Sequence, residues 1–374
     1  MFSEGQRLRA LHGDDEVADL ALGQPLEAGD AVAEAFRSAA SEGFPGRHEY
    51  MPNLGYHDVR ERTAEESGVP GLTAGNIAMT QGAAAAACVA LRTFVDPGHD
   101  VIGVAPYFPE FRLYAETASA RFVPVPVRHD MSLDLDGIGA ALSVNTAAVL
   151  LNSPNNPSGH VLRERELRAL ARLLDEHNTR HGGRVVLIVD EVYRRLIYAP
   201  NRYVDPFGIY EHTVLTRSFS KDLGIAGERI GYLVLHPSIA TDDVRLGLEL
   251  SMRALGFVNA PATAQRALLH LDSWGIDIEP YRERRDLIVD AANQAGLDFA
   301  DPEGALYLWV RSPWRDTPAL IDELARRRVL GIPGVAFGVP THIRFCFSYA
   351  PHKLRMAVDA VAAAKLEAEA AAQP

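Results

Sequence analysis

The chain has 374 residues, of which 47% are hydrophobic, and this is enough to bury a large domain and a smaller one. Its formal net charge is −12, with acidic and basic residues interspersed, so no basic stripe is available to neutralise a phosphate backbone. We therefore expect no nucleic-acid partner.

Cysteine usage and the amino-terminal residues predict a cytoplasmic protein. Cys88 and Cys346 lie far apart in apolar surroundings, which favours two reduced thiols over a disulfide framework. Residues 1–20 carry charges every few positions and lack the apolar core of a signal peptide. No run approaches the roughly 18 to 20 apolar residues of a membrane span, so we expect no membrane partner.

In chain order, the first distinctive element is the alanine-rich run at 82–91, which predicts a buried helix with small side chains. From about residue 75 to 235, short apolar runs alternate with longer segments of helical period, as in repeated β-α-β units. Four runs each predict a strand that leads into a polar loop: 99–108, 146–156, 184–193 and 213–221. Because these strands are apolar on both faces, we expect a mostly parallel sheet covered by helices.

Residues 163–183 predict an amphipathic helix that ends at a pair of glycines. Four leucines share one face of it: Leu167, Leu170, Leu173 and Leu174. After about residue 260 the pattern changes to helices around short strands, which favours a smaller α+β domain. We expect three parts: an N-terminal segment (1–40) that packs with the small domain, a large domain (41–258) and a small C-terminal domain (259–374).

Polar residues gather where the predicted strands end. Ligands bind beyond the carboxyl ends of the strands in open α/β sheets, so these residues are expected to converge. They are the turn after Met79, Tyr107, Asn156, Asp190, Tyr193 and the segment 218–221.

Lys221 follows a strand and precedes a glycine-rich turn. A lysine is usually a solvated surface residue, but burial at such a place lowers the pKa of the amine and makes it nucleophilic. An amine of that kind condenses with an aldehyde.

Asp190 ends an apolar strand, where a carboxylate is costly unless a cation or hydrogen-bond donors meet it. One interpretation is an ion pair with a structural arginine. The other is a carboxylate that keeps a ring nitrogen protonated.

Asn156 lies in a turn-forming stretch, and Tyr193 could be a core aromatic. Both could equally donate to one oxyanion at the strand ends. Two hydroxyls, a guanidinium and helix-start amides nearby are typical of a dianion site: Ser218, Ser220, Arg229 and the turn at Gly82. His177 and His181 have helical spacing but no evident third ligand, so we expect no metal site.

Eight motifs in order along the chain make it resemble the fold-type I pyridoxal-phosphate enzymes, specifically the class I and II aminotransferases of the aspartate aminotransferase superfamily. They are HEYMPNLGYHDVR, MTQGAA, APYFPEF, NSPNNPSG, VDEVY, SFSKDLGIAGERIGY, GVAFG and IRFCFSYA. The resemblance implies a seven-stranded-type, mostly parallel sheet between helices, plus a smaller α+β domain. It also implies pyridoxal 5′-phosphate, and an amino acid and a 2-oxo acid as substrates.

The same resemblance implies roles for individual residues. Lys221 would form the Schiff base and shuttle the α-proton, Asp190 would pair with the pyridinium nitrogen, and Asn156 and Tyr193 would bind the phenolate oxygen. Tyr107 would stack on the ring. The phosphate would be held by Ser218, Ser220, Arg229 and the amides of Gly82, Ala83 and Ala84. Arg344 would bind the substrate carboxylate, Gly23 would lie near the substrate, and Tyr50 would reach the phosphate of a partner subunit in a homodimer.

Substrate choice stays open at this level. Some bacterial aspartate-specific relatives carry a lysine in the phosphate turn, and the alanines here count against a dicarboxylate. Arg47 and Arg253 could read a substrate side chain or be surface arginines. Transamination between an L-amino acid and a 2-oxo acid is favoured over elimination, replacement or condensation on the same cofactor, and over a non-catalytic binding module.

Overall fold

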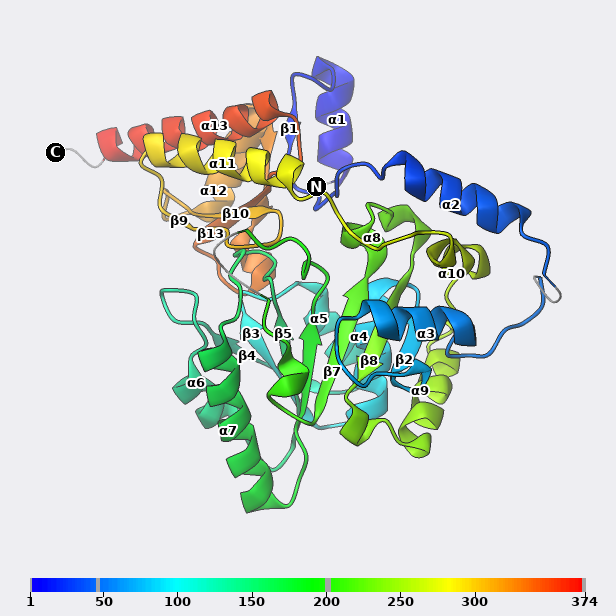
Figure 1. Cartoon of the computed structure of the whole chain (residues 1–374). Coiled ribbons are helices and arrows are strands. Elements are labelled where there is room, and N and C mark those ends of the chain that lie inside the picture. The colour runs from blue at the N-terminus through cyan, green and yellow to red at the C-terminus, as the bar shows by residue number, and fades with distance from the viewer. Residues whose placement is uncertain (1, 45–47, 199–202, 372–374) are drawn as a thin grey trace.

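The computed structural model of the protein describes residues 2–44, 48–198 and 203–371. A large sheet lies in the centre of Figure 1, with helices on both of its faces. A smaller group of strands and helices, which contains the C-terminal helix, lies beside one end of this sheet (Figure 1). The predicted α/β fold class is therefore confirmed.

Seven strands among the described residues form the large sheet, in the order β2-β8-β7-β6-β5-β3-β4. All neighbouring pairs are parallel except those of β8, which runs against β2 and β7. The bounds are β2 (Ile77–Thr80), β3 (Asp100–Ala105), β4 (Arg121–Pro126), β5 (Thr146–Asn152), β6 (Val186–Asp190), β7 (Thr213–Ser218) and β8 (Gly231–Leu235). The four strands predicted from apolar runs are β3, β5, β6 and β7.

Both faces of the large sheet are buried because its strands are apolar on both sides. In β3, Ile102 and Val104 join one hydrophobic cluster, whereas Val101 and Ala105 join another. Helices that contribute to the first cluster are α2 (Asp30–Ser41), α3 (His57–Glu66), α6 (Leu135–Ala141), α7 (Glu164–His181) and α10 (Ala262–Leu269). Those that contribute to the second are α4 (Gly82–Phe94), α5 (Glu110–Thr117) and α9 (Asp242–Ala254).

Two predicted helices appear where the pattern placed them. The leucine face of α7 is buried, and the helix ends at Gly182, whose φ of 67° is the left-handed conformation that suits glycine. The alanine run forms α4, whose small side chains let the helix lie close against the sheet.

The smaller group of elements contains a four-stranded antiparallel sheet among the described residues, in the order β12-β13-β10-β9. Its strands are β9 (Phe299–Ala300), β10 (Tyr307–Arg311), β12 (Ile332–Pro333) and β13 (His342–Cys346). Its helices are α11 (Glu279–Gln294), α12 (Thr317–Arg326) and α13 (Pro351–Ala371). The short helix α8 (Phe219–Asp222) directly follows β7, a strand of the large sheet, and is therefore part of the larger group of elements.

The N-terminal segment contacts both parts of the protein. After α1 (Phe2–His12), β1 (Ala18–Asp19) pairs in parallel with β11 (Val329–Leu330) of the smaller part. By contrast, α2 packs against α10, and both helices bury residues in the cluster under the large sheet. The division at 40/41 and 258/259 stays a prediction, and these contacts place α10 with the large sheet.

A buried charged cluster joins the two parts. His160, in the loop after β5, lies 3.3 Å from Glu166 of α7 through Nε2 and 3.3 Å from Glu303 through Nδ1. The main-chain N–H of Val161 also donates to Glu303, at 3.1 Å. Burial alone lowers the pKa of His160, but the hydrogen bonds and charges of the two glutamates together raise it to about 9.

We expect this cluster to give the stability of the protein a measurable pH dependence. A histidine with a raised folded-state pKa stabilises the fold fully below its ordinary value of 6.5 and loses that contribution as the pH rises through about 9. The free energy of unfolding in urea should therefore fall more between pH 6.5 and 9 in the native protein than in His160→Gln. His57→Gln, which alters an exposed pair with Glu61, should follow the native curve. Parallel curves for the native protein and His160→Gln would contradict the assignment.

Candidate active site

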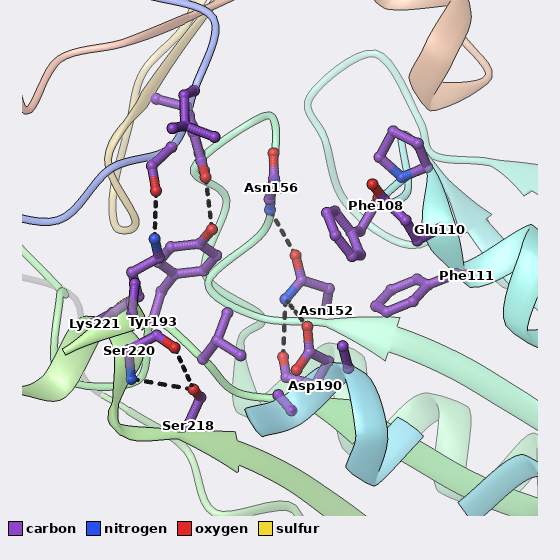
Figure 2. A pocket seen from close by; sticks show the side chains of 18 of the residues that line it. Phe108, Glu110, Phe111, Asn152, Asn156, Asp190, Tyr193, Ser218, Ser220 and Lys221 are labelled. Carbon is purple, nitrogen blue, oxygen red and sulfur yellow. Dashed lines mark hydrogen bonds between the residues drawn. The ribbon is translucent and has the colours of Figure 1, made fainter. Parts of the chain in front are cut away.

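A cavity of about 660 Å³ lies at the carboxyl ends of the parallel strands and is closed on one side by the smaller sheet. Small-molecule sites occupy this position in open α/β sheets. Eleven of the residues predicted for the site line it: Gly23, Ala83, Ala84, Asn156, Asp190, Tyr193, Ser218, Ser220, Lys221, Arg229 and Arg344. Residues far apart in the sequence thus form one site, part of which Figure 2 shows.

Lys221 differs from the other lysines of the chain in its surroundings. The sequence contains three lysines, and the other two lie on α13, where Lys353 pairs with Asp14 at 2.7 Å and Lys365 pairs with Glu369 at 3.8 Å. The Nζ of Lys221 instead donates to the carbonyl oxygen of Gly23. Burial lowers the pKa of Lys221 to about 8. An amine with this pKa has a much larger uncharged fraction near neutral pH than an ordinary lysine, and that fraction can act as a nucleophile or base.

Asp190 ends β6 and is 6% exposed. Its carboxylate accepts hydrogen bonds from Thr216 Oγ1 at 2.9 Å and Asn152 Nδ2 at 3.1 Å (Figure 2 shows the latter). Within the described part of the chain, no arginine or lysine pairs with it, so the structural ion pair considered from the sequence is not found. Burial raises the pKa of Asp190 to about 7. The arrangement suits a ligand that brings its own positive charge to this carboxylate.

Arg344 on β13 is 7% exposed and lies over the Tyr307 ring, with its Cζ 4.3 Å from the ring centroid. Its Nη1 donates to Asn156 Oδ1 at 2.8 Å and its Nη2 to the carbonyl oxygen of Ala21. Its Nε atom is buried and has no hydrogen-bond partner among the described residues. A donor left unpaired in this way fits a carboxylate ligand, which accepts from guanidinium groups through two oxygens.

Tyr193 shares a hydrogen bond with Tyr307, with 2.6 Å between the two hydroxyl oxygens. Burial raises the pKa of Tyr193 well above its ordinary value, so the phenol stays protonated and can donate. Asn156 lies between Arg344 and Asn152. Its main-chain N–H donates to Asn152 Oδ1 at 2.6 Å (Figure 2). The amide and the phenol are therefore held in position before any ligand enters.

An anion cradle lies between α4, β7 and the turn at Arg229. Ser218 Oγ donates to Ser220 Oγ at 2.9 Å and accepts from the Ser220 N–H at 3.1 Å. The first turn of α4 begins at Gly82, and its main-chain N–H groups lack partners inside the helix. A Cβ at Gly82 would lie 2.9 Å from Arg229 Nη2, and the φ of +80° also requires glycine there.

These features fit pyridoxal phosphate. Its pyridinium nitrogen would bring the missing cation to Asp190, its aldehyde would meet the amine of Lys221, and its phosphate matches the cradle of serines, arginine and helix N-terminus.

Three residues predicted for the site do not line the cavity. Tyr107 is 8% exposed, but its ring packs edge-on against Phe122, 4.9 Å between centroids, and its neighbour Phe108 lines the cavity instead. Gly82 lies behind the lining, beside Arg229. The Tyr50 side chain is fully exposed on the described chain.

The other residues singled out from the sequence that the structure describes do not line the cavity. Arg253 is exposed and does not line the cavity, and Arg47 lies outside the described residues. His177 and His181 pack ring against ring at 4.6 Å near the end of α7. No group of three or more potential metal ligands occurs in the described ranges.

Sequence reasoning missed several lining residues: Asn152, Phe108, Glu110, Tyr114 and Tyr307. Asn152 is the first letter of the NSPNNPSG motif, so its place directly after β5 could have identified it. Tyr307 lies in an ordinary apolar strand pattern with no local signal.

Comparison with known proteins gives consistent matches over nearly the whole chain. The family model "Aminotransferase class I and II" matches residues 15–361. An aspartate aminotransferase of Musicola paradisiaca is 29% identical over 351 residues, which is 89% of this chain and 83% of that protein. A Eubacterium rectale aminotransferase structure has a TM-score of 0.92 at 28% identity, covering 98% of this chain and 94% of that one. A Thermus thermophilus aspartate aminotransferase with maleate has a TM-score of 0.84 at 26% identity, covering 97% and 95%.

The uncompensated burial of Asp190 predicts how the cofactor-free protein responds to pH. A carboxyl group whose folded-state pKa is raised to about 7 destabilises the fold progressively as the pH rises from its ordinary value of 3.8, and fully above 7. Asp190→Asn should therefore gain stability relative to the native apoprotein by a few kcal/mol between pH 5 and 8, measured by urea unfolding. Asp96→Asn, an exposed carboxylate on the same domain, should show no such gain. If Asp190→Asn and the native apoprotein differ in unfolding free energy by the same amount at pH 5 and at pH 8, Asp190 is not a buried uncompensated carboxyl group.

Proposed function

The chain belongs to the class I and II aminotransferase family and is a pyridoxal-phosphate-dependent enzyme, and on this premise we propose that Lys221 is the lysine that carries the cofactor. The reaction moves an amino group from an L-amino acid to a 2-oxo acid. The donor thereby becomes a 2-oxo acid and the acceptor becomes an amino acid. The single observation that carries the residue assignment is the position of Lys221, which is partly buried, has no carboxylate partner among the described residues and lies among groups that fit the cofactor.

Nine residues besides Lys221 would contact the cofactor. Asp190 would accept from the ring nitrogen, and Asn156 and Tyr193 would donate to the phenolate oxygen. The phosphate would be held by Ser218, Ser220, Arg229 and the α4 amides at Ala83 and Ala84, next to Gly82. Phe108, which lines the cavity, would contact the ring in place of Tyr107.

When bound, the cofactor withdraws electrons from the substrate α-carbon. Lys221 would take the proton from that carbon, because a pKa of about 8 leaves part of the amine uncharged at neutral pH. The carboxylate of Asp190 would keep the ring nitrogen protonated. Arg344 would hold the substrate carboxylate through its fork of N–H groups, and its contact with Tyr307 fixes the plane of that fork.

A homodimer is part of the proposal. Tyr50 is fully exposed, so it is free to contact the phosphate of a partner subunit. We also propose a cytoplasmic enzyme with the large and small domains predicted from the sequence. No helix among the described residues is long and apolar enough to cross a membrane.

The cofactor assignment is tested by reduction and peptide mapping. Borohydride treatment of the yellow holoenzyme should place a pyridoxyl group on Lys221, and the chain has only two other lysines. With an accepted amino donor and no oxo acid, the yellow absorbance should disappear stoichiometrically and return when a 2-oxo acid is added. Lys221→Ala should reduce the turnover rate by several orders of magnitude, whereas Lys365→Ala should leave it unchanged. An adduct on another lysine would refute the assignment, and repeated turnover without an oxo acid would refute transamination.

A shared active site can be tested by mixing two inactive variants. Tyr50→Phe lacks the expected phosphate contact and Lys221→Ala lacks the amine, but subunit exchange would rebuild some sites in which both residues are intact. We expect recovery of up to about a quarter of the native activity if the exchange is statistical. The measurement is activity after mixing, with exchange followed by differently tagged subunits. Exchange without recovery would show that Tyr50 does not serve the partner's site.

A further inference from the structure

Glu110 is a cavity-lining carboxylate that the proposed function does not use. It begins α5, two residues after Phe108 in the chain, and its side chain is half-buried. Its Oε2 atom is shielded from solvent and accepts no hydrogen bond from the described residues. Arg112, the nearest arginine in the chain, pairs with Glu116 at 2.8 Å instead.

The surroundings of Glu110 are largely aromatic. Figure 2 shows it between Phe108 and Phe111, across the view from Lys221. Tyr114, Ile332 and Phe337 also line the cavity, so much of its surface is apolar. A carboxylate that is partly removed from water without a donor is costly, and a ligand that brings a positive charge offsets this cost.

The negative charge of Glu110 acts on the substrate end of the cavity. Burial raises the pKa of Tyr307 to about 12, and the charge of Glu110 contributes to the same effect. Tyr307 is also the ring beneath the Arg344 guanidinium. Glu110 thus lies within electrostatic reach of the place where the substrate carboxylate would be held.

The other charged residues of the lining already have partners or assigned roles. Asp19 pairs with Arg9 at 2.6 Å, and Asp190 accepts two side-chain hydrogen bonds. Among the described lining residues, the cations are Lys221, Arg229 and Arg344, which the proposed function assigns to the cofactor and to the α-carboxylate. The described lining therefore offers a carboxylate, and no further cation, to the substrate side chain.

We propose that Glu110 contacts the side chain of the amino donor and makes the enzyme prefer a cationic side chain. Such a side chain carries an ammonium or guanidinium group at the end of an aliphatic stem. The stem lies along the aromatic wall, where apolar burial and cation–π contact both favour it. The charged end then pairs with Glu110 while Arg344 holds the α-carboxylate. This inference rests on the proposed function, and it excludes a dicarboxylate as the preferred donor.

The test compares amino donors in pairs that differ in side-chain charge, using the holoenzyme and one fixed 2-oxo acid. The pairs are L-ornithine with L-norvaline, L-lysine with L-norleucine and L-arginine with L-citrulline, and L-aspartate and L-glutamate complete the panel. The kcat/KM of at least one cationic donor should be 10-fold or more above that of its neutral counterpart and of both dicarboxylates. Glu110→Gln should reduce that preference by about 10- to 100-fold. Glu116→Gln, an exposed carboxylate on the same helix, should preserve it.

A binding measurement keeps the inference testable if Glu110→Gln folds poorly. Calorimetric titration of the native holoenzyme with 6-aminohexanoate, hexanoate and adipate compares one chain length with three terminal groups. The aminohexanoate should bind at least 10-fold more tightly than the other two.

The outcomes separate the two levels of the proposal. If L-aspartate, L-norleucine or an aromatic amino acid is the best donor and Glu110→Gln does not alter the preference, the Glu110 inference is wrong while transamination stands. If adipate or hexanoate binds best, the inference is likewise wrong. If no amino acid in the panel or among the remaining protein amino acids discharges the yellow cofactor, the proposed function itself fails.

Discussion

Burial of charged groups without opposite charges beside them is the constraint on which the active site depends. Asp190 and the Nε of Arg344 are buried, Lys221 is partly buried, and each is incompletely paired within the described chain. Such groups destabilise a fold unless a ligand meets them. The same property gives the amine and the carboxyl group pKa values near neutrality, which proton transfer requires. The cost to stability and the capacity for chemistry thus have one physical cause.

Ion pairs directly behind the site stabilise the fold and offset this destabilisation. Glu191, the residue after Asp190, accepts from Arg217 Nε at 2.8 Å, and both side chains are 1% exposed. Arg217 precedes Ser218, so this pair ties the ends of β6 and β7 together. Asp222, the residue after Lys221, lies 3.3 Å from Arg195. In each case the residue that faces the cavity has no ion-pair partner among the described residues and its neighbour in the chain has one, because successive side chains point to different sides. The paired neighbours keep the unpaired groups in place.

The substrate end of the cavity is built differently from the cofactor end. The groups that fit the cofactor come from loops after β5, β6 and β7 and from the start of α4, all on one rigid sheet. The groups toward the substrate come from the N-terminal segment, from α5 and from the smaller sheet. Changes in α5 can therefore alter side-chain selection without disturbing the cofactor groups, and this is consistent with specificity residing at Glu110.

The sequence alone determined the strands β3, β5, β6 and β7, the helices α4 and α7 and most of the residues that fit the cofactor. Their signals are local: apolar runs, helical period, glycines at turns and polar residues directly after a strand. Only the tertiary structure shows that Phe108, and not Tyr107, lines the cavity, because the chain leaves β3 there and no fixed period tells which ring faces inward. Tyr193 meets Tyr307 across 114 residues and Asn156 meets Arg344 across 188. No described residue donates a hydrogen bond to the Oε2 atom of Glu110, and this too is a result of the packing. Such relations depend on how distant segments pack, and no local pattern of residues encodes that packing.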